Sequence, residues 1–161
     1  MLRLIRSTLT VALLSALVAC GPVCGIGAKF SLSNAHVDSS YSCPNPSDNA
    51  PYDVHATIQA QNSLSNSVSI KSISDTWTNV LVHGNWNGTK GDHGTTDIKD
   101  YSPKSVGPGG NATIKFVIPF QCTNSGAGSD TYGDFSFKFT VKTSSGNYTV
   151  SSNNHRLSFA A

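Results

Sequence analysis

The amino-acid sequence predicts an all-β protein in which two antiparallel sheets with about seven strands pack as a sandwich. Two observations lead to this fold class. The 161-residue chain has nine acidic residues, all of them Asp, and is rich in Ser, Thr, Asn and Gly, which disfavour helix interiors. Beyond residue 28, apolar and polar residues repeatedly alternate with a period of two, as in strands with one buried face. Strands of this kind bury their apolar faces when two sheets pack together.

The first two predicted strands, 29–37 and 52–62, differ in how regular the alternation is. In 29–37 the apolar positions shift by one residue midway along the segment. In 52–62 every second residue from Val54 to Ala60 is apolar, and the residues between them are polar. Each segment therefore presents an apolar face to a core.

The next two predicted strands are 67–74 and 76–83, on either side of a polar Ser-Asp pair. Connections in an antiparallel sandwich alternate between its two ends. If 68–83 is instead one continuous strand, 95–101 has to supply the seventh strand to keep that alternation.

The last three predicted strands are 112–121, 134–143 and 147–159. The first two have the clearest alternation in the chain, with Ile, Phe or Val at every second position. The turn Ser145-Gly146-Asn147 introduces the third. Because Pro119 cannot donate a backbone hydrogen bond, we expect its strand to lie at a sheet edge or to contain a bulge there.

Residues 1–19 have the form of a secretory signal peptide. Arg3 and Arg6 precede Ser7–Ala19, a run of 13 uncharged residues rich in Leu, Val and Ala. A membrane-spanning helix needs about 20 apolar residues. The run is therefore too short for a stable anchor, and we expect it to direct export and to be removed.

The residues Leu17-Val18-Ala19-Cys20 resemble the lipobox of bacterial lipoproteins. The resemblance implies that Cys20 is acylated, with palmitate as a typical chain, and begins the mature protein. It also implies a place at the cell membrane or, because Gly21 is not a retention signal, at the outer membrane of a double-membrane cell. The alternative is an ordinary cleaved signal with a coincidental Cys, for which Leu17 is a poor −3 residue. Residues 20–28 then form a flexible tether, and 29–161 form the sandwich domain.

Three cysteines, Cys24, Cys43 and Cys122, remain once Cys20 is lipidated, which is an odd number for an oxidising compartment. We predict a disulfide between Cys43 and Cys122, which lie in connections at the same end of the predicted sandwich. The alternative pair is Cys24 with Cys43, which would fix the tether to the domain. No Cys-x-x-Cys occurs, so a thiolate zinc site is not expected.

Two segments, Tyr52–Ile73 and Val106–Pro119, resemble bacterial immunoglobulin-like or fibronectin-type surface modules. In these modules a strand ends in Asn before a short polar turn, and a Pro-Gly turn introduces a later strand. The resemblance implies an immunoglobulin-like β-sandwich.

The longest stretch read as irregular, His83–Gly110, contains the candidate ligand-binding residues. Trp86 between the amides of Asn85 and Asn87 suggests an aromatic platform for carbohydrate, and Tyr101 is a further candidate. The alternative, which we favour, is a polar loop whose Trp86 packs back on the sandwich.

The same stretch contains metal-ligating residue types, but no metal and no cofactor is predicted. Asp92, Asp97 and Asp100 do not have the spacing of an EF-hand calcium site. His83 and His93 are the corresponding pair for a transition metal. No Gly-x-Ser-x-Gly nucleophile motif occurs, and the protein is not expected to be an enzyme.

The charge of the mature chain bears on its partners. Of the 11 Lys and Arg residues, Arg3 and Arg6 leave with the signal, so 9 basic residues face 9 acidic ones. A neutral chain has no electrostatic footprint for nucleic acid. We therefore expect a lipid-anchored, extracytoplasmic, non-catalytic surface module with a binding or structural role. Its expected partners are the membrane and a glycan or protein at the cell surface. The alternatives are a carbohydrate-binding module or adhesin that uses the 83–110 loop and, less favoured, a metal-dependent enzyme.

Overall fold

The structure is a computed structural model that describes residues 27–44, 46–47, 49–122 and 130–159. The predicted signal peptide, Cys20, Cys24 and the tether up to residue 26 lie outside the described residues. No helix that could span a membrane occurs in the described part of the chain. The regular elements are the strands β1 (Phe30–Val37), β2 (Ser40–Cys43), β3 (Pro51–Asn62), β4 (Val68–His83), β5 (His93–Ile98), β6 (Tyr101–Ser102), β7 (Ser105–Val106), β8 (Asn111–Gln121), β9 (Tyr132–Thr143), β10 (Gly146–Ser151) and β11 (His155–Phe159).

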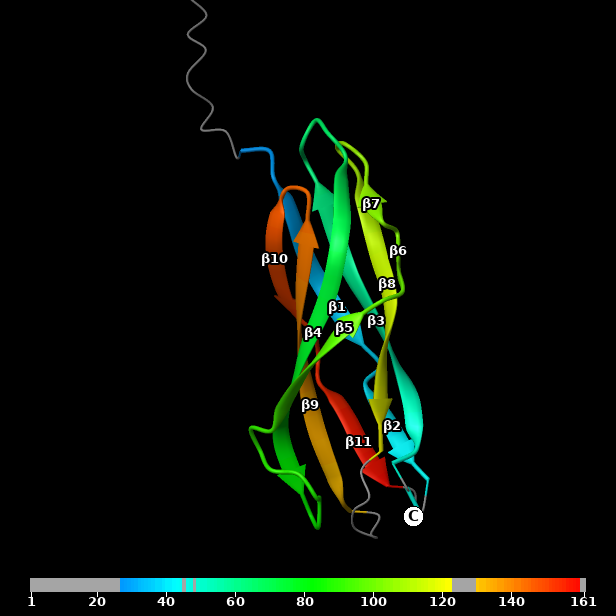
Figure 1. The fold of residues 1–161 in the computed structure, drawn as a ribbon. Coiled ribbons are helices and arrows are strands. Elements are labelled where there is room, and N and C mark those ends of the chain that lie inside the picture. The colour runs from blue at the N-terminus through cyan, green and yellow to red at the C-terminus, as the bar shows by residue number, and fades with distance from the viewer. Residues whose placement is uncertain (1–26, 45, 48, 123–129, 160–161) are drawn as a thin grey trace, which may run out of the picture.

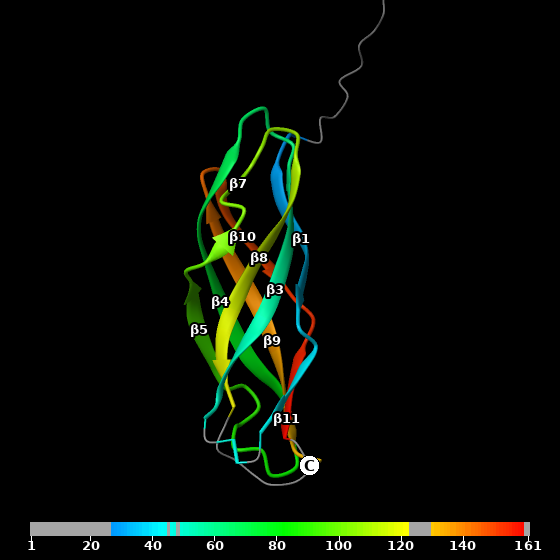
Figure 2. The ribbon, with the colours of Figure 1, turned by 90° about the vertical axis from the view of Figure 1, so that its right-hand side faces the viewer.

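The strands form two sheets that pack face to face, which confirms the predicted all-β sandwich (Figures 1 and 2). The smaller sheet has the order β1-β3-β8-β6, and the larger has the order β2-β11-β9-β4-β5. In addition, β10 pairs with β9 and β7 pairs with β4. The sheets are open and consistent with an immunoglobulin-like sandwich. One pair departs from the predicted antiparallel arrangement, because β2 and β11 run parallel.

The core is built from the alternating positions of the strands. In β3 every second residue from Tyr52 to Asn62 is buried, and β8 contributes the buried Ile114, Phe116 and Ile118. Phe116 packs edge-on against Phe139 of the other sheet, with ring centroids 5.1 Å apart. Burial of each large apolar side chain contributes about 1.5–3 kcal/mol. The period-two pattern therefore directs both sheets toward one common core.

The structure corrects the prediction of separate strands at 67–74 and 76–83. These residues form one 16-residue strand, β4, that continues through Asp75. This is the alternative of one continuous strand, and β5 at His93–Ile98 supplies the additional strand that it requires. The stretch 83–110 is correspondingly less irregular than predicted, since it contains β5, β6 and β7.

The predicted strand 147–159 is interrupted at Ser152–Asn154. Both parts, β10 and β11, run antiparallel to β9. Between them the Asn153 amide bonds to the backbone of β1: Val37 N donates to Asn153 Oδ1 at 2.9 Å, and Asn153 Nδ2 donates to Val37 O at 3.0 Å. The interruption therefore comes from a contact between residues 116 positions apart, which alternation does not reveal.

The disulfide between Cys43 and Cys122 is confirmed, with a Cα–Cα distance of 5.8 Å. It joins the end of β2 in the larger sheet to the residue that follows β8 of the smaller sheet. Cys43 is therefore not available to pair with Cys24, which was the alternative.

The two ends of the sandwich carry different features. At one end Phe30, the first residue of β1, pairs with Asn62. At the other end Pro51 pairs with Gln121, beside the disulfide. We call these the N-terminal end and the far end (Figure 1). The 12 residues of β3 connect them, so they lie roughly 35 Å apart.

Candidate functional site

Trp86, the centre of the predicted carbohydrate platform, lies in the loop after β4 and is only 7% exposed. Its ring centroid lies 5.6 Å from that of Phe159 and 6.1 Å from that of Phe135. A Cβ added at Gly133 would come within 2.8 Å of the indole, so Gly133 provides the space that the ring occupies. The structure thus matches the packing alternative, and the ring has no open face on which a sugar could stack. Asn85 and Asn87 flank it and are exposed.

Tyr101, the other candidate, lies far from Trp86, because the two lie near opposite ends of β4. Its hydroxyl donates to Ile70 O at 3.3 Å, and the ammonium group of Lys104 lies 3.3 Å from its ring centroid. Trp86 instead packs near Gly133, which pairs with Val82. Ile70 and Val82 are 12 residues apart in β4, which corresponds to roughly 40 Å. The two predicted ligand-binding positions therefore do not form one site.

The candidate metal ligands are not brought together either. Asp92 Oδ2 accepts a hydrogen bond from Thr89 N at 2.7 Å, and His83 bonds to Asp130 at 3.1 Å. Within the described ranges, no group of three or more potential His, Cys or Asp ligands could hold a metal ion.

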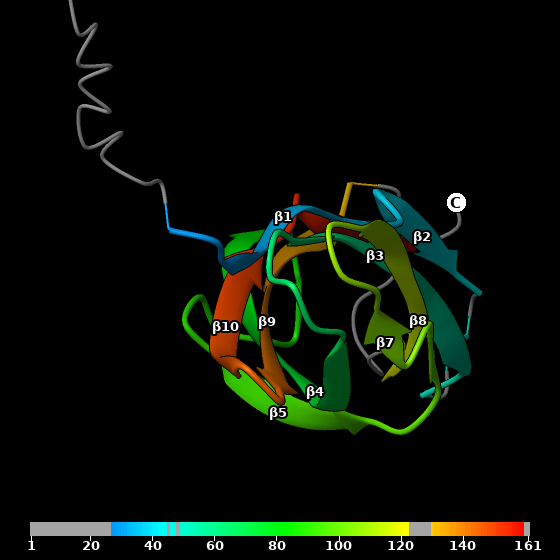
Figure 3. The ribbon, with the colours of Figure 1, turned by 90° about the horizontal axis from the view of Figure 1, so that it is seen from above.

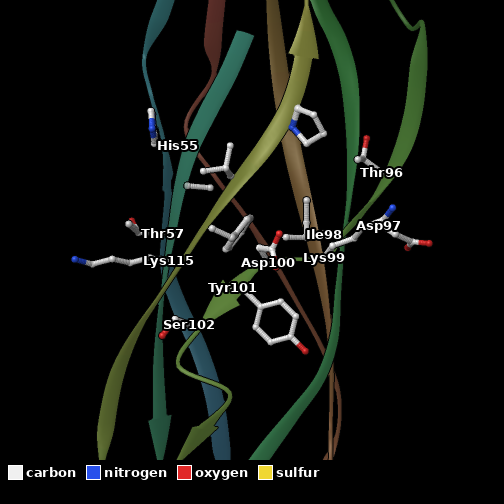
Figure 4. A pocket seen from close by; sticks show the side chains of 14 residues that line it. His55, Thr57, Thr96, Asp97, Ile98, Lys99, Asp100, Tyr101, Ser102 and Lys115 are labelled. Carbon is white, nitrogen blue, oxygen red and sulfur yellow. The ribbon is translucent and has the colours of Figure 1, made fainter. Parts of the chain in front are cut away.

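A large cavity lies at one corner of the sandwich, in a cleft where β5 of the larger sheet faces β8 of the smaller (Figure 4). We call it the β5–β8 cleft, and its volume is about 830 Å³. Ile98 and Tyr101 lie within it, whereas the amino group of Lys115 points away from it (Figure 4). The lining residues are His55, Ala56, Thr57, Thr96, Asp97, Ile98, Lys99, Asp100, Tyr101, Ser102, Lys115, Phe116, Val117 and Pro119.

A second cavity of about 470 Å³ shares Thr96 and Pro119 with the cleft. We call it the aromatic pocket, because Trp77, Phe120 and Phe135 form much of its wall. These three rings contact one another edge to face, with centroid distances between 5.3 and 5.9 Å. Pro51 and Gln121 complete the lining. The two cavities together follow the gap between the sheets toward the far end.

This corner is open because neither sheet edge is fully paired there. The short strand β6 pairs with β8 only at Lys115 and Phe116. Among the described strands, none pairs with the rest of this edge of β8, which includes Pro119. This confirms the edge position predicted for Pro119. On the opposite side β1 lies beside β10, with Phe30 packed 5.0 Å from Tyr148 (Figure 3). The gap at β5 and β8 is therefore a local feature of one corner.

Asp75 is the functional candidate that the sequence analysis missed. It is fully buried, and neither of its carboxylate oxygens has a hydrogen-bond partner. Burial raises the pKa of Asp75 to about 6. The backbone N–H of Asp75 and the hydroxyl of Thr96 counteract this in part, although neither makes a hydrogen bond of normal geometry with the carboxylate. Asp75 shares the inward face of β4 with Ile73 and Trp77, and this period-two placement is the signal in the sequence that could have identified it.

Thr96 connects Asp75 to both cavities. It lies directly opposite Asp75 in the β4–β5 pair, and directly opposed residues have Cβ atoms about 4.5–5.5 Å apart. Its side chain lines the cleft and the aromatic pocket. The corner therefore combines aromatic walls, an apolar cleft and the Thr96 hydroxyl. The Asp75 carboxylate lies opposite Thr96 and lines neither cavity itself. Such a set suits binding of a ligand that is apolar over most of its surface and carries a polar group.

No family model and no curated protein sequence matches the chain. Among solved structures it is similar to the sporulation control protein Spo0M from Bacillus subtilis, with 12% identity, a TM-score of 0.41, and coverage of 84% of this chain and 51% of that one. It is also similar to the alkylpurine DNA glycosylase AlkC from Pseudomonas fluorescens (10% identity, TM-score 0.44, 79% and 31% covered). A third similar structure is a PapD-like domain of human CEP192 (14% identity, TM-score 0.39, 96% and 98% covered). The chain thus spans about half of Spo0M and a third of the glycosylase, and at these TM-scores the likeness carries no functional assignment.

Proposed function

We propose that this protein is a lipid-anchored, extracytoplasmic surface module without catalytic activity, whose role is binding or structural. The observation that carries the proposal is the position of the first described residues. The chain enters β1 at the N-terminal end of the sandwich, and the disulfide and the loop after β4 lie at the far end, roughly 35 Å away. An anchor at the N-terminus would therefore present the far end outward.

The lipobox-like residues 17–20 provide the anchor in this proposal. Each acyl CH₂ buried in the bilayer contributes about 0.8 kcal/mol, so two acyl chains on one cysteine hold a soluble domain at a membrane. The nine residues 20–28 of the tether would reach at most about 30 Å when fully extended. The far end would then stand well clear of the lipid surface, at the cell membrane or the outer membrane.

The disulfide supports an extracytoplasmic location. Disulfides persist in oxidising compartments and are rare in the cytosol. The Cys43–Cys122 bond lies in the buried core, with both residues fully buried. A structural disulfide of this kind fits a protein that folds after export.

The proposal is tested by metabolic labelling with a clickable palmitate analogue in the bacterial host. We expect the wild-type chain to carry the label and to sediment with membranes, and Cys20→Ala to lose both properties. Cys24→Ala is the matched control, because it removes a neighbouring cysteine outside the lipobox and should remain labelled. An unlabelled wild-type chain, or label that persists in Cys20→Ala, would refute the lipid anchor.

A further inference from the structure

Asp75 places a carboxylate inside the sandwich without a counter-charge from the described residues beside it. Its side chain is fully buried, and both oxygens are without a hydrogen-bond partner. Burial of an ionised carboxylate without a partner is costly, so buried charges are normally paired. The environment of Asp75 therefore favours any group that brings a positive charge or a hydrogen-bond donor close to it.

The protein itself does not supply that charge within the described residues. Arg156 is engaged with Asp134, through hydrogen bonds of 2.7 and 2.9 Å. The lysines near the corner, Lys99 and Lys115, are exposed, and none of the described ion pairs includes Asp75. No cationic side chain in the described part of the chain therefore neutralises Asp75.

The two cavities provide the route and the surroundings for a cationic partner. Thr96, which lies directly opposite Asp75, lines both of them. On the same side the aromatic pocket presents Trp77, Phe120 and Phe135. The faces of aromatic rings attract cations, and quaternary ammonium groups are recognised by cages of several aromatic rings. The pocket volume of about 470 Å³ lies within the range of small-molecule sites.

We propose that the aromatic pocket binds a small organic cation of the alkylammonium class. The ammonium group lies on the Thr96 side of Asp75 and is attracted by its carboxylate, while the apolar part of the ligand packs on Trp77, Phe120 and Phe135. Longer alkyl chains extend past Pro119 into the β5–β8 cleft. An anion would be repelled by Asp75, and a neutral apolar molecule would leave the carboxylate without a partner. The site does not depend on acylation of Cys20.

The test compares cations with neutral molecules of the same shape. All strands of the described residues and the buried core that they form lie within Phe30–Phe159, so a chain that starts at residue 20 and carries Cys20→Ser retains the described sandwich. Isothermal titration calorimetry is performed with choline against 3,3-dimethylbutan-1-ol and with hexylammonium against hexan-1-ol. We expect each cation to bind at least about tenfold more tightly than its neutral counterpart, a difference of about 1.4 kcal/mol.

Two carboxylate variants assign the effect to Asp75. Asp75→Asn keeps the size of the side chain and removes a buried charge, so it should fold, which thermal melting checks. We expect it to lose about tenfold or more in affinity for the cations and to bind the neutral molecules as the wild type does. Asp53→Asn removes an exposed carboxylate that lines neither cavity and should change affinity less than about twofold. Absence of binding up to about 10 mM, equal binding of cations and neutral molecules, or unchanged binding by Asp75→Asn would each overturn the proposal.

Discussion

The hydroxyl of Tyr52 in β3 donates a hydrogen bond to Nε2 of His155 in β11, across 2.9 Å in the buried interior. The direction of this bond follows from the other ring nitrogen. His155 Nδ1 lies 2.7 Å from the backbone oxygen of Asp38, which can only accept a hydrogen bond, so Nδ1 carries the proton and Nε2 accepts. This buried hydrogen bond thus links a side chain of the smaller sheet to a side chain of the larger sheet.

Replacement of Tyr52 by Phe should destabilise the fold by about 1–3 kcal/mol, because Nε2 of His155 is then buried without a donor. Urea denaturation of the wild type and of Tyr52→Phe measures this difference. Tyr148→Phe is a suitable control, since the Tyr148 hydroxyl bonds only to exposed positions of Ser145. Equal losses of unfolding free energy in the two variants would contradict the prediction.

Asp75→Asn should stabilise the protein in a pH-dependent way. Burial raises the pKa of Asp75 from 3.8 to about 6, so the folded state retains its proton in a range where the unfolded state releases it. The wild type therefore loses stability as the pH rises through this window, by about 3 kcal/mol in total. The advantage of Asp75→Asn should be small at pH 3.8, grow toward pH 6 and stay constant above it. Chemical denaturation of both proteins across this range checks the prediction, which a constant difference would contradict.

Loss of the disulfide should cost about 4 kcal/mol in the chain-entropy model, because the cysteines are separated by 79 positions. We expect the Cys43→Ser/Cys122→Ser double variant to unfold at lower urea concentration than the wild type. Reducing agent should shift the wild-type midpoint toward that of the double variant and leave the double variant unchanged. Cys24→Ser serves as the control and should retain the wild-type midpoint.

Trp86→Ala should destabilise the far end by about 3–5 kcal/mol, because it leaves a cavity beside Gly133, Phe135 and Phe159. The comparison is Leu81→Ala, whose side chain is 39% exposed and whose removal should change stability by less than about 0.5 kcal/mol. Thermal and urea denaturation measure both effects. A Trp86→Ala protein as stable as the wild type would show that the ring does not pack as described.

The strands that could be predicted from the sequence are those with one buried face. The alternation in β3, β8 and β9 reflects such a face and identifies these strands from local sequence alone. Pro119 similarly indicates an edge through the chemistry of its own backbone. The disulfide could be predicted because strand order places Cys43 and Cys122 at the same end.

Features that depend on distant residues could not be predicted in this way. The break at Ser152–Asn154 arises because Asn153 bonds to Val37. The continuity of β4 through Asp75 requires strands on both sides of it, Thr96 in β5 and Phe139 in β9. The candidate site was missed for the same reason, since a polar residue in an alternating segment indicates a strand end until its pairing partners are known.

The Cys43–Cys122 bond also closes a covalent ring that contains β3 to β8, with β1 before it and β9 to β11 after it. The loop between β4 and β5 belongs to this ring. Hydrolysis of a single peptide bond anywhere between Cys43 and Cys122 would therefore leave one connected molecule, whose new chain ends remain held by the sheets. In surroundings that contain proteases, the protein could be nicked once in the loop between β4 and β5 without separation into two pieces.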